Sequence, residues 1–158
     1  MKYVRDLLRV LLLALLAVLL VNSVTPFLAG VWYAGCGDRN VEQAWLNRVT
    51  RHLTVLREHC DDPDLQGVLD YTIYRYHRIG AWDVMVWPLA TIDPRYKVIG
   101  CNWPFCPGIT IDPEVMTYPI SEGALVVVHE ALHDYWPCFG HSQVDPRIDK
   151  LEALTRQL

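Results

Sequence analysis

The sequence has 158 residues, a formal net charge of −4 at pH 7 and 52% hydrophobic residues. This length suits one domain after a short leader, and this apolar content is enough to form a buried core. Because the chain has no basic stripe, it lacks the electrostatic attraction that nucleic-acid binding requires, and we expect no nucleic-acid partner.

The N-terminal segment begins basic and continues apolar. The run Val10–Val21 has the length of a signal-peptide core, and together with the apolar stretch at 24–35 it is long enough to cross a bilayer. We therefore expect residues 1–37 to be a membrane anchor or a cleaved signal, with lipidation at Cys36 as a third alternative. The domain at 38–158 is then membrane-anchored and extracytoplasmic, or secreted or periplasmic after cleavage.

Five cysteines agree with export, and their odd number leaves at least one free, lipidated or paired between chains. Cys101 and Cys106 are close enough in sequence for a local disulfide, and either can instead pair with Cys138. Buried free thiols are the alternative.

Two helices are expected to open the domain. Apolar residues recur at helical spacing across 41–58. Asp62 followed by Pro63 is a favourable cap and first-turn pair for a second helix, which we expect to run to about Arg78.

Short strands are expected next. The segment 82–89 alternates and is rich in valine and tryptophan, 96–103 is a second candidate, and 109–111 is a third. A small, mostly antiparallel sheet is the simplest arrangement of these strands, and we expect it here. Three tryptophans are expected to pack in the core or on this sheet: Trp82, Trp87 and Trp103.

The next predicted helix covers Ala124–Tyr135, with Ser121 as its N-cap. Its first part, Ala124–Val128, is apolar nearly all round, which indicates a buried helix. The pair Asp145–Pro146 is expected to cap a last helix that runs to about Gln157. These elements together predict an α+β fold: two N-terminal helices, a small sheet, a motif helix and a C-terminal helix, preceded by a transmembrane or signal helix.

The segment His129-Glu130-Ala131-Leu132-His133 carries the candidate chemistry. Residues four apart on a helix share one face, so the imidazoles of His129 and His133 can reach one metal ion. Glu130 follows the first ligand, where its carboxylate can take a proton from a zinc-bound water and deliver it to the leaving amine. We therefore predict Glu130 as the catalytic residue and both histidines as ligands of Zn2+.

Catalytic zinc normally takes three protein ligands and leaves one position open. His141 is the predicted third ligand, because Pro137 and Gly140 break the helix and let the chain turn back. The rival is Glu152 on the next helix. Its alternative role is an exposed pair with Arg156 at the i,i+4 spacing.

The motif His129-Glu130-Ala131-Leu132-His133 resembles the zincin superfamily of metallopeptidases. The continuation Gly140-His141-Ser142 is similar to SprT-like and related minimal zincins, in which a glycine–histidine or asparagine–histidine pair gives the third ligand. The resemblance covers about residues 121–152. It implies two histidine ligands, a glutamate base, and a sheet edge that pairs with an extended peptide.

The sequence departs from the zincin pattern in two places. Asp134 stands where zincins usually have an uncharged residue, and it can either accept a hydrogen bond from a ligand histidine or cap the helix end. The gap from His133 to His141 is longer than that of the metzincins, and Phe139 stands at their glycine position. These differences argue against the metzincin subclass and leave the metal prediction in place.

The sequence therefore predicts a zinc metallopeptidase with a peptide or protein substrate. The alternatives are a zinc hydrolase of a cell-wall amide, and a non-catalytic membrane-tethered domain with structural zinc or no metal. In a structural site, Cys138 or Glu152 would supply a fourth ligand. Tyr118 or Tyr135 is a candidate hydrogen-bond donor to the oxyanion.

Overall fold

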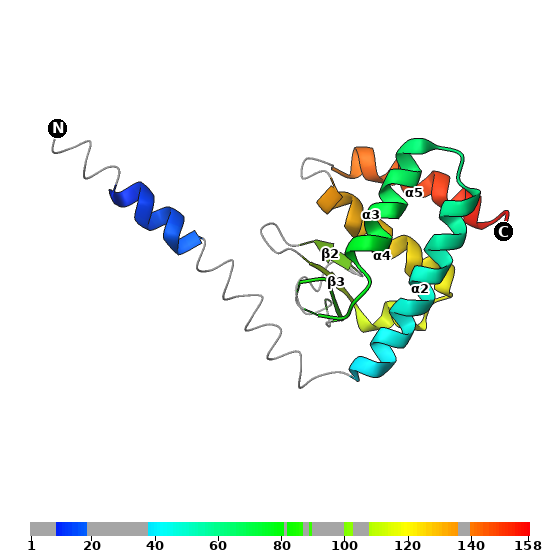
Figure 1. Cartoon of the computed structure of the whole chain (residues 1–158), viewed down its shortest axis with the longest axis horizontal. Helices are drawn as coiled ribbons and strands as arrows, with labels where there is room; N and C mark the ends of the chain where they lie inside the picture. Colours follow the sequence, from blue (N-terminus) through cyan, green and yellow to red (C-terminus); the bar gives the residue numbers. More distant parts are fainter. Residues whose placement is uncertain are drawn as a thin grey trace.

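The structure is a computed structural model, and helices predominate among the residues it describes (Figure 1). The described residues are 9–18, 38–80, 82–86, 89, 100–102, 108–135 and 140–158. Besides a helix at residues 9–18, the helices are α2 (Arg39–His59), α3 (Pro63–Arg75), α4 (Ile120–Tyr135) and α5 (His141–Thr155). The remaining elements are β1 (Val84–Val86), β2 (Gly100–Asn102), β3 (Ile109–Ile111) and the 3-10 helix η2 (Pro113–Thr117).

The predicted α+β class is wrong, because the described part of the chain is mainly helical. Its sheet consists of three strands of three residues each, in the order β1-β3-β2. β1 pairs with β3 in parallel and β2 pairs with β3 antiparallel, so the expected mostly antiparallel arrangement is also corrected. Strands this short cannot form a layer with a core of its own.

The N-terminal prediction is contradicted as well. Within the described ranges, no helix is both long and apolar enough to span a bilayer. This finding corrects the predicted transmembrane helix and the membrane-based localisation. The cleavage and lipidation predictions around Cys36 lie outside the described residues.

The positions of the first two helices follow the sequence pattern. α2 extends the predicted 41–58 by two residues or fewer at each end, and its N-cap Asp38 accepts from two backbone amides. Asp62 caps α3 with Pro63 in the first turn, as predicted. α3 ends at Arg75, earlier than the expected Arg78.

Helix α4 occupies the centre of the domain. It packs against α2, α3 and α5, and against the strands β2 and β3 (Figure 1). A Cβ added to Gly123 would lie 3.1 Å from the fully buried Trp45 ring, so this glycine lets α2 and α4 approach closely. The core also includes a row of fully buried α4 residues: Ala124, Val127, Val128, Ala131 and Leu132. The prediction of a buried motif helix is confirmed.

The prediction that Trp82 packs in the core is corrected, because this residue is 49% exposed. Trp87 and Trp103 lie outside the described residues. Among the histidines outside the motif region, His52 is half-buried, whereas His59 and His77 are exposed.

Candidate metal centre

Three histidines from two helices converge at one point. His129 and His133 lie one turn apart on α4, and His141 is the first residue of α5. One ring nitrogen of each lies within 4.8 Å of those of the other two. The ring centroids are 5.1 Å apart for His129–His133 and His133–His141, and 5.3 Å apart for His129–His141. The structure thus brings together the three residues predicted to bind the metal.

His141 is placed by helix geometry. α5 begins at His141 with Gly140 as its N-cap, four residues earlier than the expected start at Asp145–Pro146. Asp145 therefore does not cap the helix. Its Oδ1 lies 3.4 Å from His141 Nδ1, one helical turn away. When Nδ1 carries the proton, it can donate to this carboxylate, and Nε2 is then the nitrogen that can bind a metal.

The first half of α5 is held on α3 by two ion pairs. Arg147 contacts Asp64 at 2.8 Å, and Lys150 contacts Asp62 at 2.9 Å. The apolar side of α5 adds Val144, which is fully buried. These contacts orient the helix that carries His141 and place this histidine beside the α4 pair.

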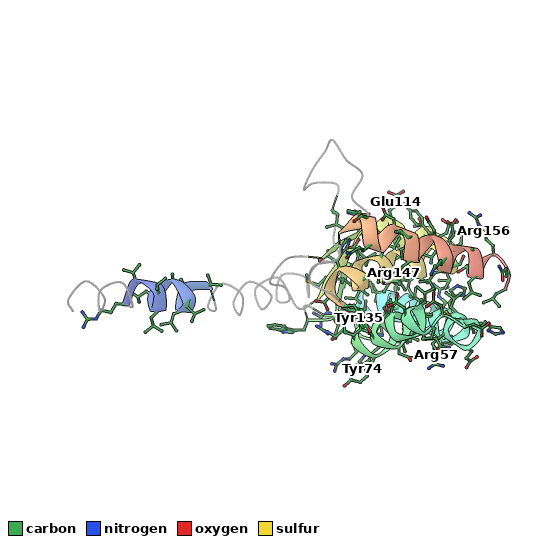
Figure 2. All side chains as sticks on the ribbon, turned by 90° about the horizontal axis from the view of Figure 1, so that it is seen from above. Arg57, Tyr74, Glu114, Tyr135, Arg147 and Arg156 are labelled. Carbon is green, nitrogen blue, oxygen red and sulfur yellow. The ribbon has the colours of Figure 1, made fainter. Side chains whose placement is uncertain are left out.

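Glu152 does not join the cluster. It lies eleven residues after His141 on the same helix, which corresponds to about 16 Å. Its Oε1 accepts from Arg156 at 2.5 Å, and Figure 2 shows Arg156 at the far end of the domain. The exposed i,i+4 pair, the alternative role of Glu152, is confirmed.

Glu130 lies against strand β2. Its side chain is 7% exposed, although the neighbouring His129 is only half-buried. A Cβ added to Gly100 would stand 2.6 Å from Glu130 Oε1 and 2.9 Å from its Cδ, closer than real atoms approach. The glutamate carboxyl group therefore fits beside β2 only because residue 100 has no side chain.

Electrostatics keep His129 in the form that binds metals. Burial lowers the pKa of His129 below its ordinary value, and the neighbouring His133 and His141 lower it further, against a smaller opposing effect of Asp145. The neutral imidazole is the metal ligand, so this shift favours binding at mildly acidic as well as neutral pH.

Other candidate residues have partners that the sequence did not predict. Asp134 accepts hydrogen bonds from Tyr71 and Tyr76. The Tyr118 hydroxyl donates to Glu114 at 3.2 Å, so its donor is engaged on η2. The Tyr135 ring packs against the Tyr71 ring at 5.0 Å.

The structure tests only some of the cysteine predictions. Cys60 is buried and free, which matches the free-thiol alternative for this residue. Cys106 and Cys138 lie outside the described residues, as does the side chain of Cys101.

Sequence reasoning missed three contributions to the site. The spacing of His141 and Asp145 was a usable signal, because residues four apart face each other once a helix covers them. The contact of Gly100 with Glu130 joins positions thirty residues apart, and the Tyr71 and Tyr76 contacts to Asp134 span about sixty. No local pattern signals such contacts.

In comparisons with known proteins, no family model, no curated protein and no solved structure matches this chain.

The donor set fits a transition metal. Three imidazole nitrogens suit zinc and neighbouring transition metals better than magnesium or calcium, which prefer oxygen. Nitrogen ligands bound about 2 Å from a tetrahedral zinc are about 3.3 Å apart. The three nitrogens lie within 4.8 Å of one another, so each pair needs to approach by no more than about 1.5 Å to bind one ion.

We expect the wild-type protein to bind one zinc ion, and His133→Ala or His141→Ala to lose tight binding, because each substitution leaves two of three nitrogen donors. Competition with a chromogenic chelator measures the affinity. His59→Ala is the matched control, since this exposed histidine bonds only to its own helix. Equal zinc affinity in wild type and both site variants would contradict the assignment.

We expect the metal-free protein to lose stability as the pH falls below about 6.5. Burial lowers the folded-state pKa of His129 and His52 from 6.5, so at acidic pH the unfolded chain binds more protons than the folded one. This contribution is fully present above the unfolded-state pKa and is lost as the pH falls through the lower, folded-state one. Urea unfolding across this range measures it, and His129→Gln should flatten the profile. A wild-type profile as flat as that of the variant would refute the shift.

Proposed function

We propose that this protein is a zinc-dependent metallopeptidase. One observation carries the proposal: three imidazole nitrogens from α4 and α5 lie within 4.8 Å of one another, and a buried glutamate directly follows the first of these histidines. This is the donor set and the neighbouring carboxylate that metal-assisted hydrolysis of an amide bond requires.

The three histidines would hold the ion and leave one side accessible. The His141 side chain is 71% exposed, and His129 and His133 are half-buried. Water and substrate can therefore reach the cluster from the solvent side. Bound zinc lowers the pKa of a coordinated water to about 7 and polarises a carbonyl oxygen.

Glu130 performs the proton transfers. Its carboxylate takes a proton from the attacking water and delivers it to the leaving amine, so that the C–N bond breaks as the amine is protonated. The contact with Gly100 limits the positions that this carboxylate can occupy. A base held in place beside its proton donor needs no reorganisation at the moment of reaction.

The ligand count favours a catalytic over a structural site. A structural zinc has four closed protein ligands, whereas catalytic zinc has three and an open position. Among the described residues the cluster contains three ligands, and Glu152, the rival fourth, pairs with Arg156. Cys138 lies outside the described residues.

We expect Glu130→Gln to keep zinc affinity and to lower the rate of peptide hydrolysis by about 10²- to 10⁴-fold, because an amide cannot accept the proton. Cleavage of a fluorescence-quenched peptide library by the zinc-loaded protein measures the rate. Glu122→Gln is the matched control, since Glu122 is exposed in the first turn of the same helix.

Three outcomes separate the possibilities. Wild-type protein that binds zinc but cleaves no peptide and no peptidoglycan amide would support a structural site and contradict the enzyme. Cleavage of the peptidoglycan amide alone would replace the peptidase with the cell-wall hydrolase. Cleavage of peptides by Glu130→Gln at the wild-type rate would remove Glu130 from the mechanism.

We expect Gly100→Ala to reduce the turnover number while zinc remains bound, because the added methyl group displaces the Glu130 carboxyl from its place beside β2. Gly80→Ala is the matched control: a Cβ at that glycine meets nothing within 4 Å. Peptide cleavage and zinc affinity are measured on both variants. An unchanged turnover number for Gly100→Ala would show that this close contact does not position the base.

A further inference from the structure

The last turn of α4 contains the second histidine of the cluster. α4 ends at Tyr135, so His133 lies two residues before the end of the helix. The final turn of a helix lacks backbone partners for its carbonyls and opens more easily than the middle. A ligand in this turn needs support from outside the helix if its distance to His129 is to stay fixed.

Asp134 supplies an anchor at that place. Its Oδ2 accepts hydrogen bonds from Tyr71 at 2.5 Å and from Tyr76 at 2.6 Å; Tyr71 lies in the second half of α3, and Tyr76 is its C-cap. The neighbouring Tyr135 ring packs edge-on against the Tyr71 ring at 5.0 Å. The turn that carries His133 is thereby fastened to α3 by two consecutive residues.

Without its tyrosine partners, the Asp134 carboxylate would destabilise the C-terminal end of α4. A negative side chain near a helix C-terminus is repelled by the partial negative charge of the unpaired carbonyls. At Asp134 this cost is offset by two phenol donors on one oxygen. Burial and the Asp134 carboxylate raise the pKa of Tyr71 to about 12 and that of Tyr76 further, so both hydroxyls stay protonated as donors.

The tyrosines are in turn held from the sheet side. The Arg75 guanidinium lies 5.2 Å from the centre of the Tyr76 ring and pairs with Asp83 at 2.8 Å. The Asp83 carbonyl accepts from the backbone amide of Ile109 in β3. The anchor thus connects the α4 end to the same small sheet that supports Glu130.

We propose that Tyr71 and Tyr76 are positioning residues of the metal centre, which fix the last turn of α4 through Asp134 and so set the separation of the His129 and His133 imidazoles. This inference rests on the proposed metal site. It assigns a role in metal geometry to two hydroxyl groups that do not themselves bind the ion.

The test removes the hydroxyls and keeps the rings. Tyr71→Phe, Tyr76→Phe and the double variant are compared with Tyr74→Phe, whose parent residue is on the same helix but 82% exposed and points outward in Figure 2. Each full-length protein is loaded with Zn2+ for affinity and with Co2+ for its visible absorption spectrum. Circular dichroism checks that each variant is folded.

The double variant should lose roughly tenfold to a hundredfold in zinc affinity, and its cobalt bands should shift, because a displaced His133 changes the ligand field. Tyr74→Phe should match the wild type in both. The single variant Tyr71→Phe retains one phenol donor on Asp134 and replaces the double variant if the latter does not fold. Its zinc affinity and cobalt spectrum should change in the same direction, by smaller amounts.

Unchanged zinc affinity and an unchanged cobalt spectrum in the folded variants would overturn the positioning role and leave the metal site intact. A loss of thermal stability without a spectral shift would likewise overturn it, because a merely structural contact acts in that way. Failure of the wild-type protein to bind either ion would overturn the metal site and this inference together.

Discussion

The enclosure of α4 is the constraint on which the site depends. This helix is covered by α2, α3 and α5 and by the ends of two short strands, and its apolar residues form the centre of the core. A helix fixed on so many sides cannot rotate without opening the core, which is close-packed. The two histidines on its uncovered face therefore have fixed directions, and the partner helix α5 needs to supply only one further donor.

The sequence predicted the parts of the fold that depend on local patterns. Helical periodicity located α2 and α4, and the Asp62–Pro63 pair located the start of α3, because caps and amphipathic stripes act within one or two turns. The fold class was wrong because, among the described residues, the segments 82–89 and 96–103 contribute only three strand residues each. Strand length depends on partners elsewhere in the chain, which a single segment does not reveal.

The site shows the same division between local and distant contacts. The grouping of His129 with His133 follows from their spacing alone. The helix break after α4 predicted that His141 lies beside them, and the structure places it there. The role of Asp145 was misjudged because the start of α5 was placed four residues too late. The composition of the apolar N-terminal run predicted a membrane-spanning helix. Among the described residues, no helix is long and apolar enough to span a membrane.

The attachment of α5 to α3 has two components of different physical character. The Arg147–Asp64 and Lys150–Asp62 pairs are partly open to solvent, so added salt weakens their attraction. The burial of Val144 and Leu151 is not weakened by screening. Changes in salt concentration therefore act on the orientation of the helix that begins with His141 more than on the interior of the domain.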